Sequence, residues 1–283
     1  MSTAAHRWRE WVQQHQHRLG ERNTQRWIRG VLLSAAVLVL LVPIRPGGRP
    51  VIPLFDFSAP APIRGQVPTV RAGSPAPVLQ RQLDLAGEPA SADARRLAQW
   101  VVDSADNGPL NFAILDKRSA KVFVFEPGGK LIGASPVLLG YAAGDDSVVG
   151  IGKRPIEEVR PFERTTPAVR FRAEPGRNAV PEDVLWVDYE AAVSMHRVRL
   201  TNPAEHRAER LKSNDARARR ISYGCINMPP AFFEQVLWPN FKRRGGYVYV
   251  LPEVKTLDAV FPALASQQQQ QQQQQKKTRT TTI

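Results

Sequence analysis

The one cysteine of the chain lies in a sequence context that favours nucleophilic chemistry. Cys225 belongs to the segment ISYGCINM (residues 221–228), directly after a glycine, and two prolines and an apolar run at 231–238 follow it. Prolines suit the first turn of a helix, where backbone N–H groups have no partner within the helix. We therefore expect Cys225 in a tight turn near a helix N-terminus, where peptide dipoles and free N–H groups favour the thiolate. A lone cysteine is more often an inert core residue, so this prediction depends on the turn and on the compartment argued below.

A thiolate nucleophile needs a neighbouring base and hydrogen-bond donors for the oxyanion that it generates. After residue 92 the chain contains two histidines, His196 and His206. His196 ends an apolar run typical of a strand, whereas His206 lies in a polar stretch of alternating charge, so we predict His196 as the base. The residues predicted to form the oxyanion hole and to orient the site are Ser222, Tyr223, Gly224 and Asn227. Together these residues predict acyl transfer by a Cys–His pair.

The N-terminal region has the pattern of a membrane anchor. Residues 1–29 contain six arginines against two glutamates, and residues 30–42 carry no charge. Residues 27–44 approach the roughly 20 apolar residues that span a bilayer, with an arginine able to extend to the interface. We predict a cytoplasmic segment at 1–29 and an uncleaved transmembrane anchor at 30–44, in preference to a cleaved signal peptide or a buried core helix. The arginine excess places all later residues on the outer side of the membrane.

This placement on the outer side of the membrane changes how the unpaired cysteine and the net charge are interpreted. Exported domains usually pair their cysteines, so one unpaired cysteine favours a free reactive thiol over an intermolecular disulfide. The net charge of +13 and the pI near 10.4 would suit nucleic acid binding in a cytoplasmic protein. For an exported domain they indicate attraction to anionic envelope surfaces instead, and we predict no nucleic acid partner. The sequence leaves the oligomeric state open.

The remaining pattern predicts a mostly β domain with a few helices (α+β). A proline-rich linker is expected at 45–92, the domain itself at 93–253, and a disordered glutamine-rich tail at 254–283. Helical spacing covers residues 92–105. The predicted strands are 110–115, 121–125, 130–139, 169–171, 184–187, 192–195 and 247–251.

Residues 222–227, SYGCIN, resemble the Ser/Thr-His-Gly-Cys-hydrophobic-Asn signature of L,D-transpeptidases with the YkuD-type catalytic domain. Residues 193–196 resemble the strand of that family that carries the catalytic histidine. Residues 115–117 and 122–133 resemble its opening hairpin, and residues 165–171 its Thr-Pro-containing strand. The resemblance spans about residues 110–253, over half of the chain.

This resemblance implies a YkuD-like β-sandwich or barrel with the catalytic cysteine in a turn before a helix. It implies a peptidoglycan L,D-transpeptidase that forms 3→3 cross-links or wall attachments through a Cys225 thioester, with no metal and no organic cofactor. Its partners would be peptidoglycan stem peptides, on the periplasmic side of the inner membrane. With water as acceptor the same site would be an L,D-carboxypeptidase or a hydrolase. A catalytically inactive wall-binding module is a further alternative, whereas a thiol redox protein lacks the second cysteine of a Cys-x-x-Cys pair.

Three features depart from the family pattern. Tyr223 stands where histidine is usual, and Val169 stands where glycine is common. The segment between His196 and Ser222 is also longer than usual, and His206 lies closer to the usual spacing from the cysteine. Residues 197–220 contain eight basic and three acidic residues. We predict that this segment forms a lid or rim that meets substrate carboxylates, through Arg217, Arg219 and Arg220, with a solvated surface helix as the alternative.

Overall fold

A computed structural model describes residues 80–266 of the chain. The strands are β1 (Phe112–Asp116), β2 (Lys121–Phe125), β3 (Leu131–Pro136), β4 (Leu139–Gly140), β5 (Arg170–Arg177), β6 (Asp183–Asp188), β7 (Val193–Arg197), β8 (Arg220–Ser222), β9 (Ile226–Met228) and β10 (Gly246–Val250). The α-helices are α2 (Ala92–Ser104), α3 (Arg207–Lys212), α4 (Pro230–Phe232), α5 (Trp238–Phe241) and α6 (Leu257–Val260). Short 3-10 helices cover Ile151–Lys153, Ile156–Glu158, Pro161–Glu163, Pro203–Glu205 and Ala216–Arg219.

The predicted cytoplasmic segment, membrane anchor and glutamine run lie outside the described residues, as does the linker up to residue 79. Within residues 80–266 no helix has both the length and the apolar character needed to cross a bilayer.

Eight strands form one mixed sheet in the order β3-β2-β1-β10-β5-β6-β7-β9. Pairing is antiparallel except between β1 and β10 and between β7 and β9. The last strand returns toward the first, because Leu138 and Asn227 exchange backbone hydrogen bonds of 2.7 and 2.9 Å just after β3. The sheet is therefore a nearly closed barrel, and the predicted class, mostly β with a few helices, is confirmed.

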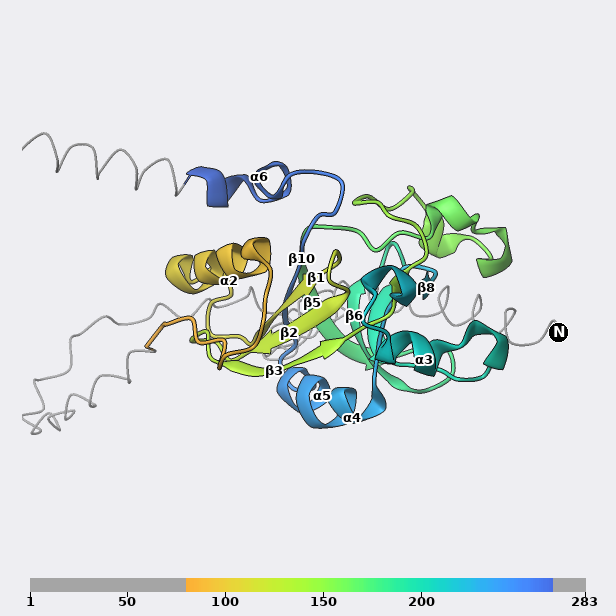
Figure 1. Ribbon diagram of the computed structural model, residues 1–283, viewed down its shortest axis with the longest axis horizontal. Coiled ribbons are helices and arrows are strands. Elements are labelled where there is room, and N and C mark those ends of the chain that lie inside the picture. Colours follow the sequence, from red (N-terminus) through yellow and green to blue (C-terminus); the bar gives the residue numbers. More distant parts are fainter. Residues whose placement is uncertain (1–79, 267–283) are drawn as a thin grey trace, which may run out of the picture. The chain divides into compact units, whose positions relative to one another are not determined.

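Alternation along the central strands divides the apolar side chains between two cores. Phe112 and Ile114 of β1 point to one face of the sheet and pack with α2 and α6, while Ala113 and Leu115 point to the other. That second face packs with β6, β7, β9 and the helical segment that includes Phe233. In Figure 1, α2 and α6 lie on one side of β1 and β2, and α4 and α5 lie on the opposite side. Each fully buried large side chain stabilises the fold by about 1.5–3 kcal/mol.

Local sequence accounts for several elements. α2 covers almost the predicted range, because Ser91 accepts from the N–H of Ala94 at its start and Ala105 adopts a left-handed conformation (φ 55°) at its end. β2 coincides with the predicted strand at 121–125. The predicted helix after Pro229 is present as α4, a π-helical turn (Phe233–Leu237) and α5. Pro239 follows this turn, and it has no N–H with which to continue an α-helical ladder.

Two predicted boundaries need correction. Residues before Ala92 already pack on the domain, since Arg81 donates to Asn107, Pro127 and Gly108, at 2.5 Å to the carbonyl of Gly108. The domain also continues past residue 253 into α6, whose Leu257 is 6 % exposed and joins the core over α2. The buried residues of this segment, Leu257, Phe261 and Leu264, form too short a pattern to distinguish it from the tail in the sequence.

Candidate active site

Cys225 lies in the turn that connects β8 to β9. Gly224 precedes it at φ 129°, and a Cβ at this glycine would lie 2.7 Å from the carbonyl oxygen of Thr165. The hydroxyl of Ser222 accepts from the N–H of Gly224 (3.1 Å) and donates to the carbonyl of Cys225 (2.6 Å). The turn is therefore closed by its own serine and requires glycine before the cysteine.

Replacing Gly224 by alanine is expected to destabilise the fold by about 1–3 kcal/mol, because the new Cβ meets both an unfavourable φ and a backbone oxygen. Urea unfolding measures this effect. Gly87 is the matched control, since it also has a positive φ (76°) but nothing within 4 Å of its would-be Cβ. Equal losses for the two alanine variants would show that the contact with Thr165 contributes nothing.

Thr166 supports this turn from the segment that leads into β5. It is 1 % exposed, and its hydroxyl donates to the carbonyl of Gly224 (2.9 Å) while accepting from the N–H of Gly140 (3.0 Å). Thr166 was not among the predicted site residues, although the Thr-Pro segment was part of the resemblance. The threonine next to Pro167 was the signal that the sequence offered.

His196 reaches the cysteine turn because β7 and β9 pair in parallel, with His196 opposite Asn227. Its Nδ1 lies 2.7 Å from the carbonyl oxygen of Arg197, and its Nε2 lies 3.2 Å from the side-chain nitrogen of Asn227. His206 is exposed on a different segment, immediately before α3, at φ 48°. The structure thus places His196, and not His206, beside the thiol.

The thiol of Cys225 has an unusual environment. Burial raises the pKa of Cys225, but the hydrogen bond and charge of His196, together with hydrogen bonds from Ser194, lower it below the ordinary value of a thiol. Sγ also lies 3.8 Å from the hydroxyl of Ser194 and 3.5 Å from the carbonyl of Ala192, to which it donates. Strand β9 separates the cysteine from the helix that begins at Pro230. The predicted influence of a helix N-terminus is therefore replaced by that of β7, whose residues favour the thiolate.

Two backbone donors of the turn remain available for an oxyanion. The N–H groups of Tyr223 and Cys225 donate to no acceptor among the described residues, whereas the N–H of Gly224 is used by Ser222. The ring of Tyr223 is stacked under the guanidinium of Arg164, whose Cζ lies 3.9 Å from the ring centroid. Of the backbone N–H groups of residues 223–225, those of Tyr223 and Cys225 are thus available to an oxyanion.

A cavity of about 260 Å³ opens onto the thiol. It is lined by Cys225, His196 and Tyr223 together with apolar and basic residues, the latter being Arg154 and Arg199. The apolar wall consists of Ile151, Ile156, Val159, Val180 and Trp186. The segment 151–159 therefore forms one wall of the cavity, a role that the sequence did not predict.

The three arginines predicted at the rim do not line this cavity. Arg217 is exposed and pairs with Asp215 on its own turn. Arg219 donates to the carbonyls of Ser119, Ala120 and Ser213. Arg220 pairs with Glu253 and donates to the carbonyl of Lys117. Arg217 is thus paired within its own turn, and Arg219 and Arg220 bind acceptors on other segments, so the basic residues that line the cavity are Arg154 and Arg199 instead.

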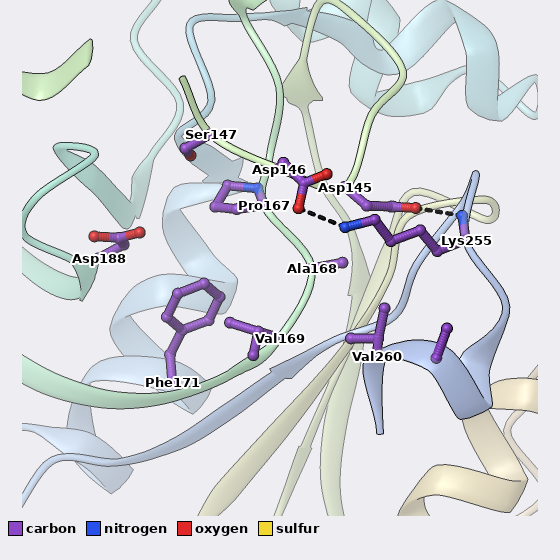
Figure 2. Close-up of a pocket in the computed structure, with 11 residues that line it drawn as sticks. Asp145, Asp146, Ser147, Pro167, Ala168, Val169, Phe171, Asp188, Lys255 and Val260 are labelled. Atoms are coloured by element: carbon purple, nitrogen blue, oxygen red, sulfur yellow. Dashed lines mark hydrogen bonds and ion pairs between the residues drawn. The ribbon is translucent and has the colours of Figure 1, made fainter. Parts of the chain in front are cut away.

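A second cavity of about 390 Å³ lies over the segment that carries Thr166 (Figure 2). Asp145 and Asp146 border it, and Lys255 contacts both, through its backbone N–H to Asp145 (2.6 Å) and through Nζ to Asp146 (2.6 Å). Asp145 also receives Nζ of Lys117 at 2.7 Å, and that Nζ binds the carbonyl of Thr166 at 2.8 Å. A buried ion pair thus anchors the segment that supports the cysteine turn.

This ion pair gives stability a pH dependence. Burial raises the pKa of Asp145, but hydrogen bonds from Lys117 and from the N–H groups of Lys255, Glu253 and Val254 lower it to about 2. Because the folded-state pKa lies below the ordinary value near 3.9, Asp145 stabilises the fold above about pH 4, and this contribution is lost as pH falls toward 2. We expect about 2 kcal/mol to be lost in this range. Urea unfolding at pH 5 and pH 3 should show a smaller decrease for Asp145→Asn than for the unaltered chain, and equal decreases would contradict the assignment.

Within residues 80–266 no cluster of three or more histidine, cysteine, aspartate or glutamate side chains is arranged to hold a metal ion.

Solved structures similar to this chain are L,D-transpeptidases. One is the Ldtfm-avibactam carbamoyl enzyme (16 % identity, TM-score 0.31), with 50 % of this chain and 49 % of that one covered. A cysteine-to-serine mutant of Enterococcus faecium L,D-transpeptidase has 18 % identity and a TM-score of 0.29, with 50 % and 49 % covered. The catalytic domain of the E. faecium enzyme has 14 % identity and a TM-score of 0.28, with 50 % of this chain and 98 % of that domain covered.

The chain thus spans about half the length of the first two of these proteins. No protein-family model matches the sequence, and no curated protein matches it.

Proposed function

We propose that the chain is a cysteine L,D-transpeptidase that acts on peptidoglycan stem peptides. The observation that carries the proposal is the position of His196 on β7 beside the turn of Cys225, in which the N–H groups of Tyr223 and Cys225 donate to no acceptor among the described residues. The local likeness of residues 222–227 to the transpeptidase signature supplies the substrate class. We place the activity outside the inner membrane, with residues 30–44 as the anchor.

In the first half-reaction His196 accepts the proton of Cys225 and the thiolate attacks the carbonyl carbon of the third residue of a tetrapeptide stem. The oxyanion receives the N–H groups of Tyr223 and Cys225. The C–N bond then breaks, the amine of the terminal D-alanine takes the proton from His196, and a thioester on Cys225 remains.

In the second half-reaction an amine of another stem, or of an envelope protein, attacks the thioester carbonyl. His196 takes the proton of that amine, the C–S bond breaks, and the thiolate is regenerated. Water in place of the amine would yield a tripeptide, which is the carboxypeptidase outcome. The guanidinium groups of Arg154 and Arg199 border the cavity, where each is paired with a carboxylate of the chain, Glu163 and Glu182 respectively.

The test uses the full chain and its Cys225→Ala variant, each incubated with a disaccharide tetrapeptide and followed by mass spectrometry of products and intact protein. We expect D-alanine, stem dimers and a covalent adduct on Cys225, all absent from the variant. Tripeptide without dimers would replace the transpeptidase assignment with a carboxypeptidase. Absence of every product and adduct would contradict catalysis and leave the wall-binding alternative.

A further inference from the structure

Arg207 lies in the segment between His196 and Ser222 and contacts the active site through Asn227. It begins α3, and its side chain is 13 % exposed. Its Nη1 donates to Oδ1 of Asn227 at 2.6 Å, and its Nε pairs with Glu205 at 2.5 Å. Asn227 is 1 % exposed, so this contact joins a nearly buried amide to a guanidinium.

Three hydrogen bonds fix the orientation of the Asn227 amide. While Oδ1 accepts from Arg207, Nδ2 lies 3.3 Å from the carbonyl of Cys225 and 3.2 Å from Nε2 of His196. Turning the amide by 180° would place its NH₂ group against the guanidinium and its oxygen against the carbonyl of Cys225. Both contacts would be repulsive, so only one orientation satisfies all partners.

The orientation of the Asn227 amide determines which ring nitrogen of His196 carries the proton. Because Nδ2 is a donor, Nε2 of His196 must accept and carries no proton. Nδ1 faces the carbonyl of Arg197 at 2.7 Å and must therefore carry the proton. A proton on Nε2 would face the NH₂ group of Asn227, which cannot turn away while Arg207 holds its oxygen.

We propose that Arg207 is a positioning residue that acts through Asn227 to hold His196 in the Nδ1–H tautomer with Nε2 free of a proton. Nε2 faces the amide of Asn227, and under the proposed function this nitrogen, which carries no proton, takes the proton of the thiol. The segment 197–220 thus serves the site by orienting its base, a role distinct from the lid predicted from its charge. The consequence for turnover rests on the proposed function, whereas the tautomer follows from the contacts themselves.

Other charged or titratable groups near His196 come from several elements. Glu182, just before β6, interacts with the ring charge, and Arg199 pairs with Glu182 (2.6 Å). Arg154, Tyr223 and Cys225 share the cavity with His196. Glu205 faces Arg207 alone. All of these remain in place in the variants below, so that a change can be assigned to Arg207.

The test records the ring ¹⁵N signals of His196 in the ¹⁵N-labelled full chain, with the signals identified by their loss in His196→Gln. At neutral pH we expect the Nδ1–H tautomer. In Arg207→Leu the ratio of Nδ1–H to other forms should fall by about fivefold, the effect of one ordinary hydrogen bond. Arg207→Lys, which keeps a donor, should restore the ratio. Arg210→Leu is the matched control, because Arg210 of the same helix donates to the carbonyls of Glu205 and Ala218 and not to Asn227.

Asn227→Asp provides a variant of almost the same shape in case Arg207→Leu unfolds. Its carboxylate would present oxygen to both Arg207 and Nε2, while Nδ1 still faces the carbonyl of Arg197, so we expect a proton on Nε2 in addition to the one on Nδ1. An Nε2–H tautomer in the unaltered chain, or a tautomer ratio unaffected by both Arg207→Leu and Asn227→Asp, would overturn the inference.

The spectra need no turnover, which separates this inference from the proposed function. A shifted tautomer ratio in a chain that releases no D-alanine would support the role of Arg207 and contradict the transpeptidase. If D-alanine is released, the acid limb of the pH–rate profile should move to higher pH in Arg207→Leu by about half to one pH unit. An active chain whose acid limb and tautomer do not respond to Arg207 would contradict the inference and leave the transpeptidase intact.

Discussion

Replacing His196 by alanine is expected to slow D-alanine release from the tetrapeptide by about 10²–10⁴-fold, the usual contribution of a general acid–base residue. His196 is the only histidine within residues 80–266 that lines the cavity of Cys225, and its hydrogen bond and charge favour the thiolate. The alanine variant therefore loses both the proton acceptor for the thiol and the proton donor for the leaving amine. The initial rate, followed by mass spectrometry, gives the size of the effect.

His206→Ala is the matched control for this prediction. His206 lies closer in sequence to the usual position of a transpeptidase histidine, but it is exposed and makes no contact with the cysteine turn. We expect its replacement to leave the rate within twofold of that of the unaltered chain, an ordinary result for an exposed residue. A large loss in His206→Ala with none in His196→Ala would reverse the assignment of the base.

The sequence was most informative where local pattern and tertiary structure agree. Residues 121–125 alternate in a way that suits a strand with two covered faces, and β2 places Val122 and Val124 in one core and Phe123 and Phe125 in the other. The choice of His196 over His206 followed from the apolar run before it, and β7 occupies that run.

The surroundings of the thiol depended on partners far away in the sequence. β8 and β9 are three residues each, and they pair with β4 and β7, which no periodicity can indicate. The lower pKa of Cys225, which was expected from a helix N-terminus, comes instead from His196 and Ser194 on β7. Arg219 and Arg220 look available in the sequence because their carbonyl acceptors, those of Ser119 and Lys117, lie about a hundred residues away. Charge density predicted a rim formed by Arg217, Arg219 and Arg220, and none of the three lines the cavity.

Replacing Lys117 by methionine is expected to cost about 3–5 kcal/mol of the free energy of unfolding, as is usual when one partner of a buried ion pair is removed. The side chain of Lys117 is fully buried, and its Nζ lies 2.7 Å from Asp145 and 3.4 Å from Glu253. It also donates to the carbonyls of Gly144 (2.5 Å) and Thr166 (2.8 Å). Methionine fills the space of the chain but leaves the Asp145 carboxylate without its counter-charge.

Lys121→Met is the matched control for urea unfolding, because Lys121 also forms an ion pair, with Glu88 at 2.5 Å, but its side chain is 21 % exposed and that of Glu88 is 38 % exposed. Such a pair is worth about 0–1 kcal/mol. Equal losses in the two variants would show that burial of the Lys117 pair adds nothing. If the larger loss is found, activity should fall with it, since Thr166 connects Lys117 to the carbonyl of Gly224 and hence to the turn that presents the thiol. Lys117 would then stabilise both the fold, through its ion pair with Asp145, and the position of Cys225, through Thr166.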